Sequence, residues 1–182
     1  MAHPGERITF DDLFQRNNQM CGLYQVFMLT KAAFYKAGQY PTAHGFDTQS
    51  FAWRFMTAGL TAYTCPDTTY LLRVHFKQSY YLREYEAGKN NFNWQIILRE
   101  HIDLFTKETQ DFIINFNCSD FTRNIFSELI TRPHFLRPNY QELLGTLPLH
   151  EYEYTNHQKI IARNSLHGWY LRIKQKLHLS HQ

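Results

Sequence analysis

The longest run of apolar positions covers residues 21–37, where hydrophobic side chains would occupy almost every face of a helix. A helix without a polar face is typical of burial inside a domain. Gly38 follows directly, and glycine favours the left-handed backbone conformation that ends many helices. The pattern therefore predicts a central buried helix over residues 21–37 that ends at Gly38.

Three further segments have the spacing or the end signals of helices. Residues 47–58 open at Asp47, whose carboxylate suits the N-cap position. Apolar residues recur at helical spacing over residues 93–116, which predicts one long amphipathic helix. Residues 119–131, with Ser119 as the cap, are expected to form another helix.

Strand patterns lie mainly near the C-terminus. Residues 68–76 are β-branched and aromatic, which favours a strand. Residues 150–155, 158–163 and 168–174 predict three more strands, and their short connections favour antiparallel hairpins. Helices come first and an antiparallel sheet comes last, which indicates the α+β class within one domain, residues 1–182.

Composition fits one soluble domain. The 182 residues are 43% hydrophobic and 16% aromatic, which is enough to form one substantial core. The net charge is only +3, and no dense basic stripe with interleaved aromatic residues is present, so we expect no nucleic-acid partner. No apolar run reaches the ~18 residues of a membrane span, and the polar N-terminus is unlike a secretory signal. These features predict a cytoplasmic protein, or one exported into a host cell without a cleaved signal. They leave the oligomeric state open.

The cysteines do not form a disulfide pattern. Cys21, Cys65 and Cys118 are odd in number and widely spaced, which favours a reducing compartment and no zinc site. No base stands at a recognisable spacing from Cys65 or Cys118, so both are expected to be structural.

Cys21 has the sequence context of a reactive thiol. At the first turn of the predicted helix, the positive end of the helix dipole favours the thiolate, which is the nucleophilic form. Gln15 lies six residues upstream on an irregular segment. If that segment folds back, the Gln15 amide and the Cys21 backbone N–H can together bind a developing oxyanion.

His150 and Asn164 supply a base and a residue to orient it. His150 opens one predicted strand and Asn164 closes the next. Neighbouring antiparallel strands would bring the two side chains together, and an amide oxygen can hold an imidazole in one tautomer. His75, in the strand expected at residues 68–76, is a second candidate base.

The order Gln, Cys, His, Asn is that of the papain-like cysteine peptidases, which this chain resembles. QRNNQMCGLY, at residues 15–24, resembles the active-site stretch of the staphopains. KIIARNSLHGWYLRIK, at residues 159–174, resembles the papain-family stretch around its asparagine. The chain departs from the family at Leu166, where papains have tryptophan, and at Glu151, where they have a small residue.

The resemblance implies a fold, a reaction and a class of partner. The fold would be the papain-like two-part fold, with an N-terminal helical half around a central buried helix and a C-terminal antiparallel β-sheet half. Cys21 would be the nucleophile, His150 the general base, Asn164 the orienting residue and Gln15 the oxyanion-hole donor. The activity would be that of a cysteine peptidase that cleaves a peptide or isopeptide bond without a metal or organic cofactor. The substrate would be a protein or peptide, and analogy extends this to a bacterial effector acting on a host or ubiquitin-like protein.

Two other functions stay open on the sequence. Arg73 with Glu151 and Glu153 resembles the arginine and Glu-x-Glu of mono-ADP-ribosyltransferases, although any strand with an acidic exposed face produces that motif. The other alternative is a non-catalytic papain-like binding module.

Overall fold

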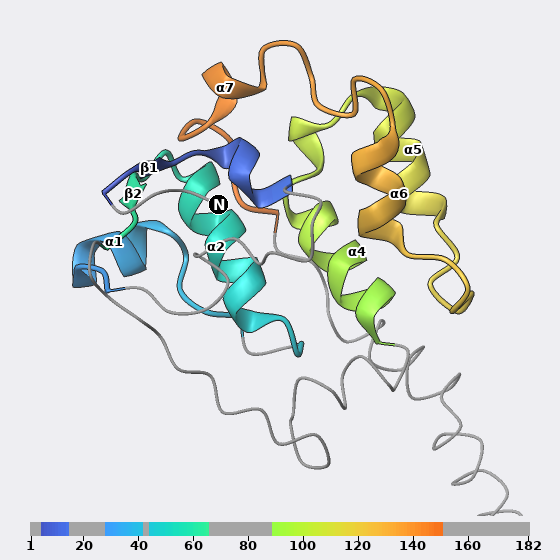
Figure 1. Ribbon diagram of the computed structural model, residues 1–182, viewed down its shortest axis with the longest axis horizontal. Helices are drawn as coiled ribbons and strands as arrows, with labels where there is room; N and C mark the ends of the chain where they lie inside the picture. The colour runs from blue at the N-terminus through green and yellow to red at the C-terminus, as the bar shows by residue number, and fades with distance from the viewer. Residues whose placement is uncertain (1–4, 15–27, 42–43, 66–88, 151–182) are drawn as a thin grey trace, which may run out of the picture.

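Two helices, α2 (Asp47–Thr57) and α4 (Asn90–Glu100), pack against each other at the centre of the structure (Figure 1). The computed structural model describes residues 5–14, 28–41, 44–65 and 89–150. Helices α5 and α6 contact α4, whereas α1 and η1 contact α2. The remaining elements are β1 (Arg7–Ile8), η1 (Phe10–Phe14), α1 (Lys31–Lys36), β2 (Ala62–Tyr63), η3 (Ile102–Leu104), α5 (Lys107–Asn115), α6 (Ile125–Thr131) and α7 (Tyr140–Leu143).

The expected papain-like α+β fold is wrong, because the described part of the chain is mostly helical. Its one sheet joins β1 and β2 as an antiparallel pair, with Arg7 opposite Tyr63 and Ile8 opposite Ala62. Both strands belong to the N-terminal half of the chain, so this pair is not the predicted C-terminal sheet half. The strands expected at residues 68–76, 158–163 and 168–174, and all but His150 of the strand at 150–155, lie outside the described residues.

The central buried helix is α2 rather than the one predicted over residues 21–37. Every residue from Gln49 to Met56 is buried, so α2 is enclosed on all sides. Within its described residues, 28–37, the predicted segment is helical at α1, which buries no residue, and Met28 before it is 94% exposed. Residues 21–27 lie outside the described part. The predicted end at Gly38 is confirmed, because this glycine has a φ of +84° directly after the helix.

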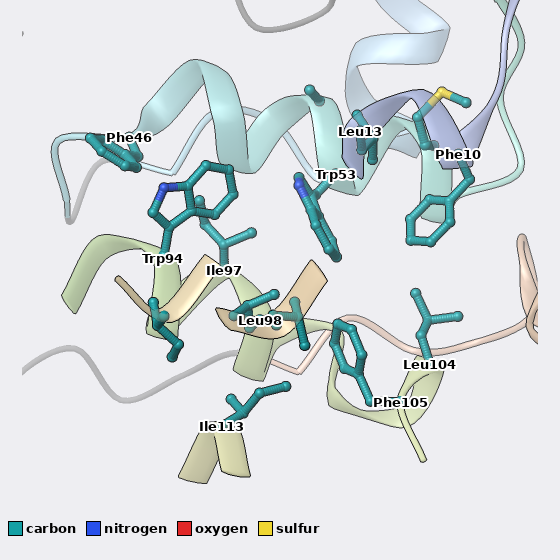
Figure 2. Packing of buried hydrophobic residues seen from close by; sticks show 14 of the residues in the cluster. Phe10, Leu13, Phe46, Trp53, Trp94, Ile97, Leu98, Leu104, Phe105 and Ile113 are labelled. Atoms are coloured by element: carbon teal, nitrogen blue, oxygen red, sulfur yellow. The ribbon is translucent and has the colours of Figure 1, made fainter. Parts of the chain in front are cut away.

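A shared aromatic and aliphatic core holds α2 against α4. Figure 2 shows Trp53 of α2 facing the side of the core formed by α4 and the segment that follows it. Phe46, just before α2, meets Trp94 of α4 edge to face at a centroid distance of 5.7 Å. Such aromatic pairs add specific geometry to the area they bury. The core also includes Phe10, Leu13, Ile97, Leu98, Leu104, Phe105 and Ile113.

The single long helix predicted over residues 93–116 is wrong, because α4 ends at Glu100 and α5 begins at Lys107. The backbone between the two helices bonds to a distant segment instead of continuing the helix. Thr106 N–H donates to the carbonyl of Phe135 at 3.1 Å, and Arg137 N–H donates to that of Leu104 at 2.9 Å. These long-range bonds replace the helical ones, so the amphipathic pattern continues while the helix does not.

Two predicted helix starts are displaced. Asp47 is the first residue of α2 and not its cap, because Phe46 occupies the N-cap position. Helix α6 begins at Ile125, and its cap is Asn124 in place of the predicted Ser119. The Asn124 side-chain oxygen accepts a hydrogen bond from the Ser127 N–H at 2.8 Å. This bond satisfies one of the free N–H groups at the start of the helix.

Replacing Asn124 with alanine is expected to lower the free energy of unfolding by about 0.5–2 kcal/mol, the usual cost of losing an N-cap side chain. Ser119→Ala is the matched control, since Ser119 is exposed and does not cap α6. Urea denaturation of both variants measures the difference. An equal effect of the two substitutions would show that Asn124 does not cap α6.

Candidate functional site

A cavity of about 190 Å³ opens between four segments that are far apart in the sequence. Its lining comes from the end of α1, the last turn of α2, the residues that follow α4 and the segment 145–150. The ionisable side chains in this lining are those of Lys36, Arg54, His101, Asp103 and His150. We take this cavity as the candidate functional site.

The buried ion pair between Arg54 and Glu100 lies beside the cavity and joins α2 to α4. Glu100 is 0% exposed, and its two oxygens accept from Arg54 Nη2 at 2.7 Å and Nε at 3.2 Å. The Ser50 hydroxyl donates to the same carboxylate at 3.1 Å. Arg54 Nη1 also donates to the carbonyls of Gly38 and Gln39, so the same guanidinium holds the end of α1. A bidentate pair of this kind is the strong form of an arginine–carboxylate contact.

His101, at the end of α4, is a neutral buried histidine. Its ring stacks on Trp53 with a centroid distance of 5.6 Å and an interplanar angle of 26°. Burial lowers the pKa of His101 to about 4; Glu100 opposes the shift, and Arg54 and His150 add to it. Nε2 of this ring has no hydrogen-bond partner within the described residues. At neutral pH, His101 therefore contributes a polar atom to the cavity rather than a charge.

His150 forms a histidine–carboxylate pair with Asp103. The His150 Nε2 and Asp103 Oδ2 atoms lie 2.5 Å apart, and the His150 side chain is 46% exposed. The backbone N–H of His150 also donates to the Glu100 carbonyl at 3.3 Å. Among the described residues Nδ1 has no hydrogen-bond partner. A carboxylate on one ring nitrogen fixes the tautomer and leaves the other nitrogen to exchange a proton with a reactant.

Two facing glycines set the position of the segment that carries His150. Gly59 and Gly145 have φ values of +69° and +84°, which side chains disfavour. A β-carbon on Gly59 would come within 3.1 Å of the Gly145 Cα atom. Gly145 N–H donates to the Thr57 carbonyl at 2.7 Å. This close approach fixes the start of the segment 145–150 against the end of α2.

Of the residues predicted for catalysis, the structure places His150 at the cavity. Gln15, Cys21 and Asn164 lie outside the described residues, so their distances to His150 are not part of this geometry. The same holds for the alternative sites at His75, Arg73, Glu151 and Glu153.

Asp103 is one of the site residues that the sequence reasoning missed, and Arg54 is another. Asp103 falls within the predicted long helix, where an acidic residue is taken as part of a solvated face. The break after Glu100 turns Asp103 toward His150 instead. No local signal marks this pairing, since the two residues are 47 positions apart.

Cys118 is a structural cysteine. Its side chain is buried, and its thiol donates to the Gln95 side-chain oxygen at 3.2 Å. Burial raises the pKa of this thiol to about 12, so it stays protonated and unreactive at neutral pH. Cys65 is exposed.

Two further properties concern the described residues as a group. The described helices are too short and too polar for any of them to cross a membrane. Within the same residues, no three His, Cys, Asp or Glu side chains gather as a metal site would require.

Arg54→Met is expected to lower the free energy of unfolding by about 3–5 kcal/mol, because it leaves the Glu100 carboxylate buried without its cation. The double variant Arg54→Met with Glu100→Met is expected to recover much of that loss, since no unpaired charge remains. Chemical denaturation measures both. Arg132→Met, which removes an exposed pair with Glu108, is the control and is expected to cost at most about 1 kcal/mol. A double variant no more stable than the single one would contradict this account of the pair.

Gly59→Ala is expected to destabilise the fold more than Gly5→Ala. Both glycines have left-handed backbone, which costs an alanine about 1–2 kcal/mol. Only Gly59 has a neighbour that the new methyl group would strike, which adds about 1–3 kcal/mol, whereas Gly5 has nothing within 4 Å. Thermal and urea unfolding compare the two. Equal losses would mean that the Gly59–Gly145 approach adds no constraint.

A scan against protein-family models, a search of curated proteins and a search of solved structures each found no match.

Proposed function

We propose that the protein is a thiol hydrolase that cleaves a peptide or isopeptide bond, with Cys21 as the nucleophile and His150 as the general base. The observation that carries the proposal is the His150–Asp103 pair beside a cavity. A base of this kind must be oriented on one side and reachable on the other. His150 meets both requirements, because Asp103 holds Nε2 and the side chain is partly exposed.

We propose that Asp103, in place of Asn164, orients His150. An imidazole has two ring nitrogens, and the base needs one of them for the thiol. With Nε2 bonded to Asp103, Nδ1 is the nitrogen that would face the Cys21 sulfur, and none remains for Asn164. A carboxylate also stabilises the imidazolium that forms when the base takes a proton, which an amide does less well. Gln15 keeps its proposed role as oxyanion donor.

The reaction runs through an acyl-enzyme. His150 takes the Cys21 thiol proton, and the sulfur attacks the carbonyl carbon of the substrate. The carbon–nitrogen bond then breaks, and the imidazolium returns the proton to the leaving amine. In the second half, His150 takes a proton from water, and the resulting hydroxide attacks the thioester carbonyl. The bond to sulfur breaks, the Cys21 thiol is restored, and a carboxylic acid leaves.

Cys21 is expected to react with iodoacetamide faster than Cys65 in the native protein, because pairing with an imidazole favours the thiolate. At pH 6, His150→Ala should slow this labelling on the order of 10²-fold, since an unpaired thiol is then almost wholly protonated. Asp103→Asn should slow it and Asn164→Ala should leave it nearly unchanged. Mass spectrometry of tryptic peptides measures the rate at each cysteine.

Two controls sharpen this labelling experiment, and a hydrolysis assay follows it. Asp111→Asn makes the same chemical change on an exposed surface of α5 and should have no effect. Buried Cys118 should react slowest in every variant. Hydrolysis is then measured on a panel of peptide and ubiquitin-like substrates, with Cys21→Ala as the inactive reference. The proposal fails if Cys21 reacts no faster than Cys65, or if His150→Ala leaves its rate unchanged. A larger effect of Asn164→Ala than of Asp103→Asn would return the orienting role to Asn164.

A further inference from the structure

Two lining residues of the cavity, Arg54 and His101, have hydrogen-bonding capacity that no described residue uses. The Arg54 guanidinium has five N–H groups, and the structure gives partners to four of them, at Glu100, Gly38 and Gln39. The fifth has none among the described residues. His101 Nε2 is likewise without a partner within them. Buried polar groups are normally satisfied, and an exception in a cavity wall is a place where a bound group can complete the bonding.

The charges around the cavity favour an anion. Glu100 balances Arg54, and Asp103 is engaged with His150. Lys36 also lines the cavity and carries a positive charge that no described carboxylate pairs. Among the described lining residues, Asp103 alone repels an anion, and its bond to His150 offsets part of that repulsion. The unmatched features are therefore a cation and N–H donors, which an anionic acceptor fits.

The size of the cavity limits the ligand. A volume of about 190 Å³ has room for roughly six water molecules and is below the range of most small-molecule pockets. A group the size of one amino-acid side chain fits this space.

We infer that the cavity binds a short aliphatic carboxylate, and that in the working enzyme this group is a glutamate or aspartate side chain of the substrate. The second half of this inference rests on the proposed function, whereas the carboxylate site does not. The Arg54 N–H and the Nε2–H tautomer of His101 donate to the carboxylate, and Lys36 attracts it. The substrate bond to be cleaved then lies beside His150, at the exposed side of the same cavity.

The experiment titrates the full chain, carrying Cys21→Ala to prevent turnover, with glutamate capped by acetyl and methylamide groups. NMR with ¹⁵N-glycine reports binding through the amide of Gly145, which lines the cavity, and Gly5 is the remote reference. We expect saturable shifts at Gly145 and not at Gly5. The capped glutamine analogue, which has the same shape without the charge, should bind at least about fivefold more weakly. Added salt should weaken the binding of the glutamate analogue.

Two lysines of α1 provide the matched variants. Lys36→Met should weaken binding of the capped glutamate roughly two- to fivefold, as expected for an exposed charge. Lys31→Met removes an exposed lysine of the same helix that does not line the cavity, and it should leave binding unchanged. Both substitutions are on the surface, so neither depends on the buried Arg54–Glu100 pair.

Each outcome decides a separate point. Equal binding of the glutamate and glutamine analogues, or no shift at Gly145, overturns the carboxylate site. Binding of free butanoate without binding of the capped glutamate keeps the carboxylate site but overturns the substrate side chain as its source. If the titration shows saturable binding but the labelling experiment finds Cys21 unreactive, the carboxylate site stands and the hydrolase proposal falls. If Cys21 is reactive but no binding is seen, the hydrolase proposal stands and the carboxylate site falls.

Discussion

The carboxylate of Glu100 is completely buried, and much of the structure depends on how its charge is balanced. A buried charge is tolerated only when it is paired and hydrogen-bonded. Arg54 meets it with two bonds and Ser50 adds a third, so α2 and α4 must lie at one relative position. The same guanidinium reaches the carbonyls of Gly38 and Gln39, which brings the end of α1 to that point. One arginine thus fixes three segments that meet at the wall of the cavity.

The same charges also divide the two histidines into different roles. His101 remains neutral because burial lowers its pKa, and the neighbouring Arg54 lowers it further. His150 lies at the exposed side and has a carboxylate of its own in Asp103. A cavity that contains a neutral imidazole and a carboxylate-bound imidazole can bind a ligand near the first and exchange a proton at the second. This separation is the basis of both proposals made for the cavity.

The sequence predicted those features that local patterns encode. Helix α2 and its approximate bounds follow from the Asp47 signal, which marks the helix start to within one residue, and the end of α1 follows from Gly38. The break between α4 and α5 was not predictable, because it depends on backbone bonds from Leu104 and Thr106 to residues about thirty positions away. The fold class was wrong because it depended on a C-terminal antiparallel sheet as well as on helices. The described part of the chain is mostly helical, and its one sheet is the short pair of β1 and β2.

The candidate site was predictable at one residue. His150 was predicted from the resemblance to papain-like peptidases, and in the structure it lines a cavity. Its partner Asp103 was not predicted, because no linear pattern pairs residues 47 positions apart across a helix break. No local sequence pattern indicates the Arg54–Glu100 pair either, because its two residues are 46 positions apart. Each of these contacts closes a loop of almost fifty residues, so it costs chain entropy that no local element repays. The cavity is assembled from the neighbourhoods of residues 38, 54, 101 and 150, so it exists only while all four segments are in place. A chain whose segment 145–150 is undocked would keep helices but have no site.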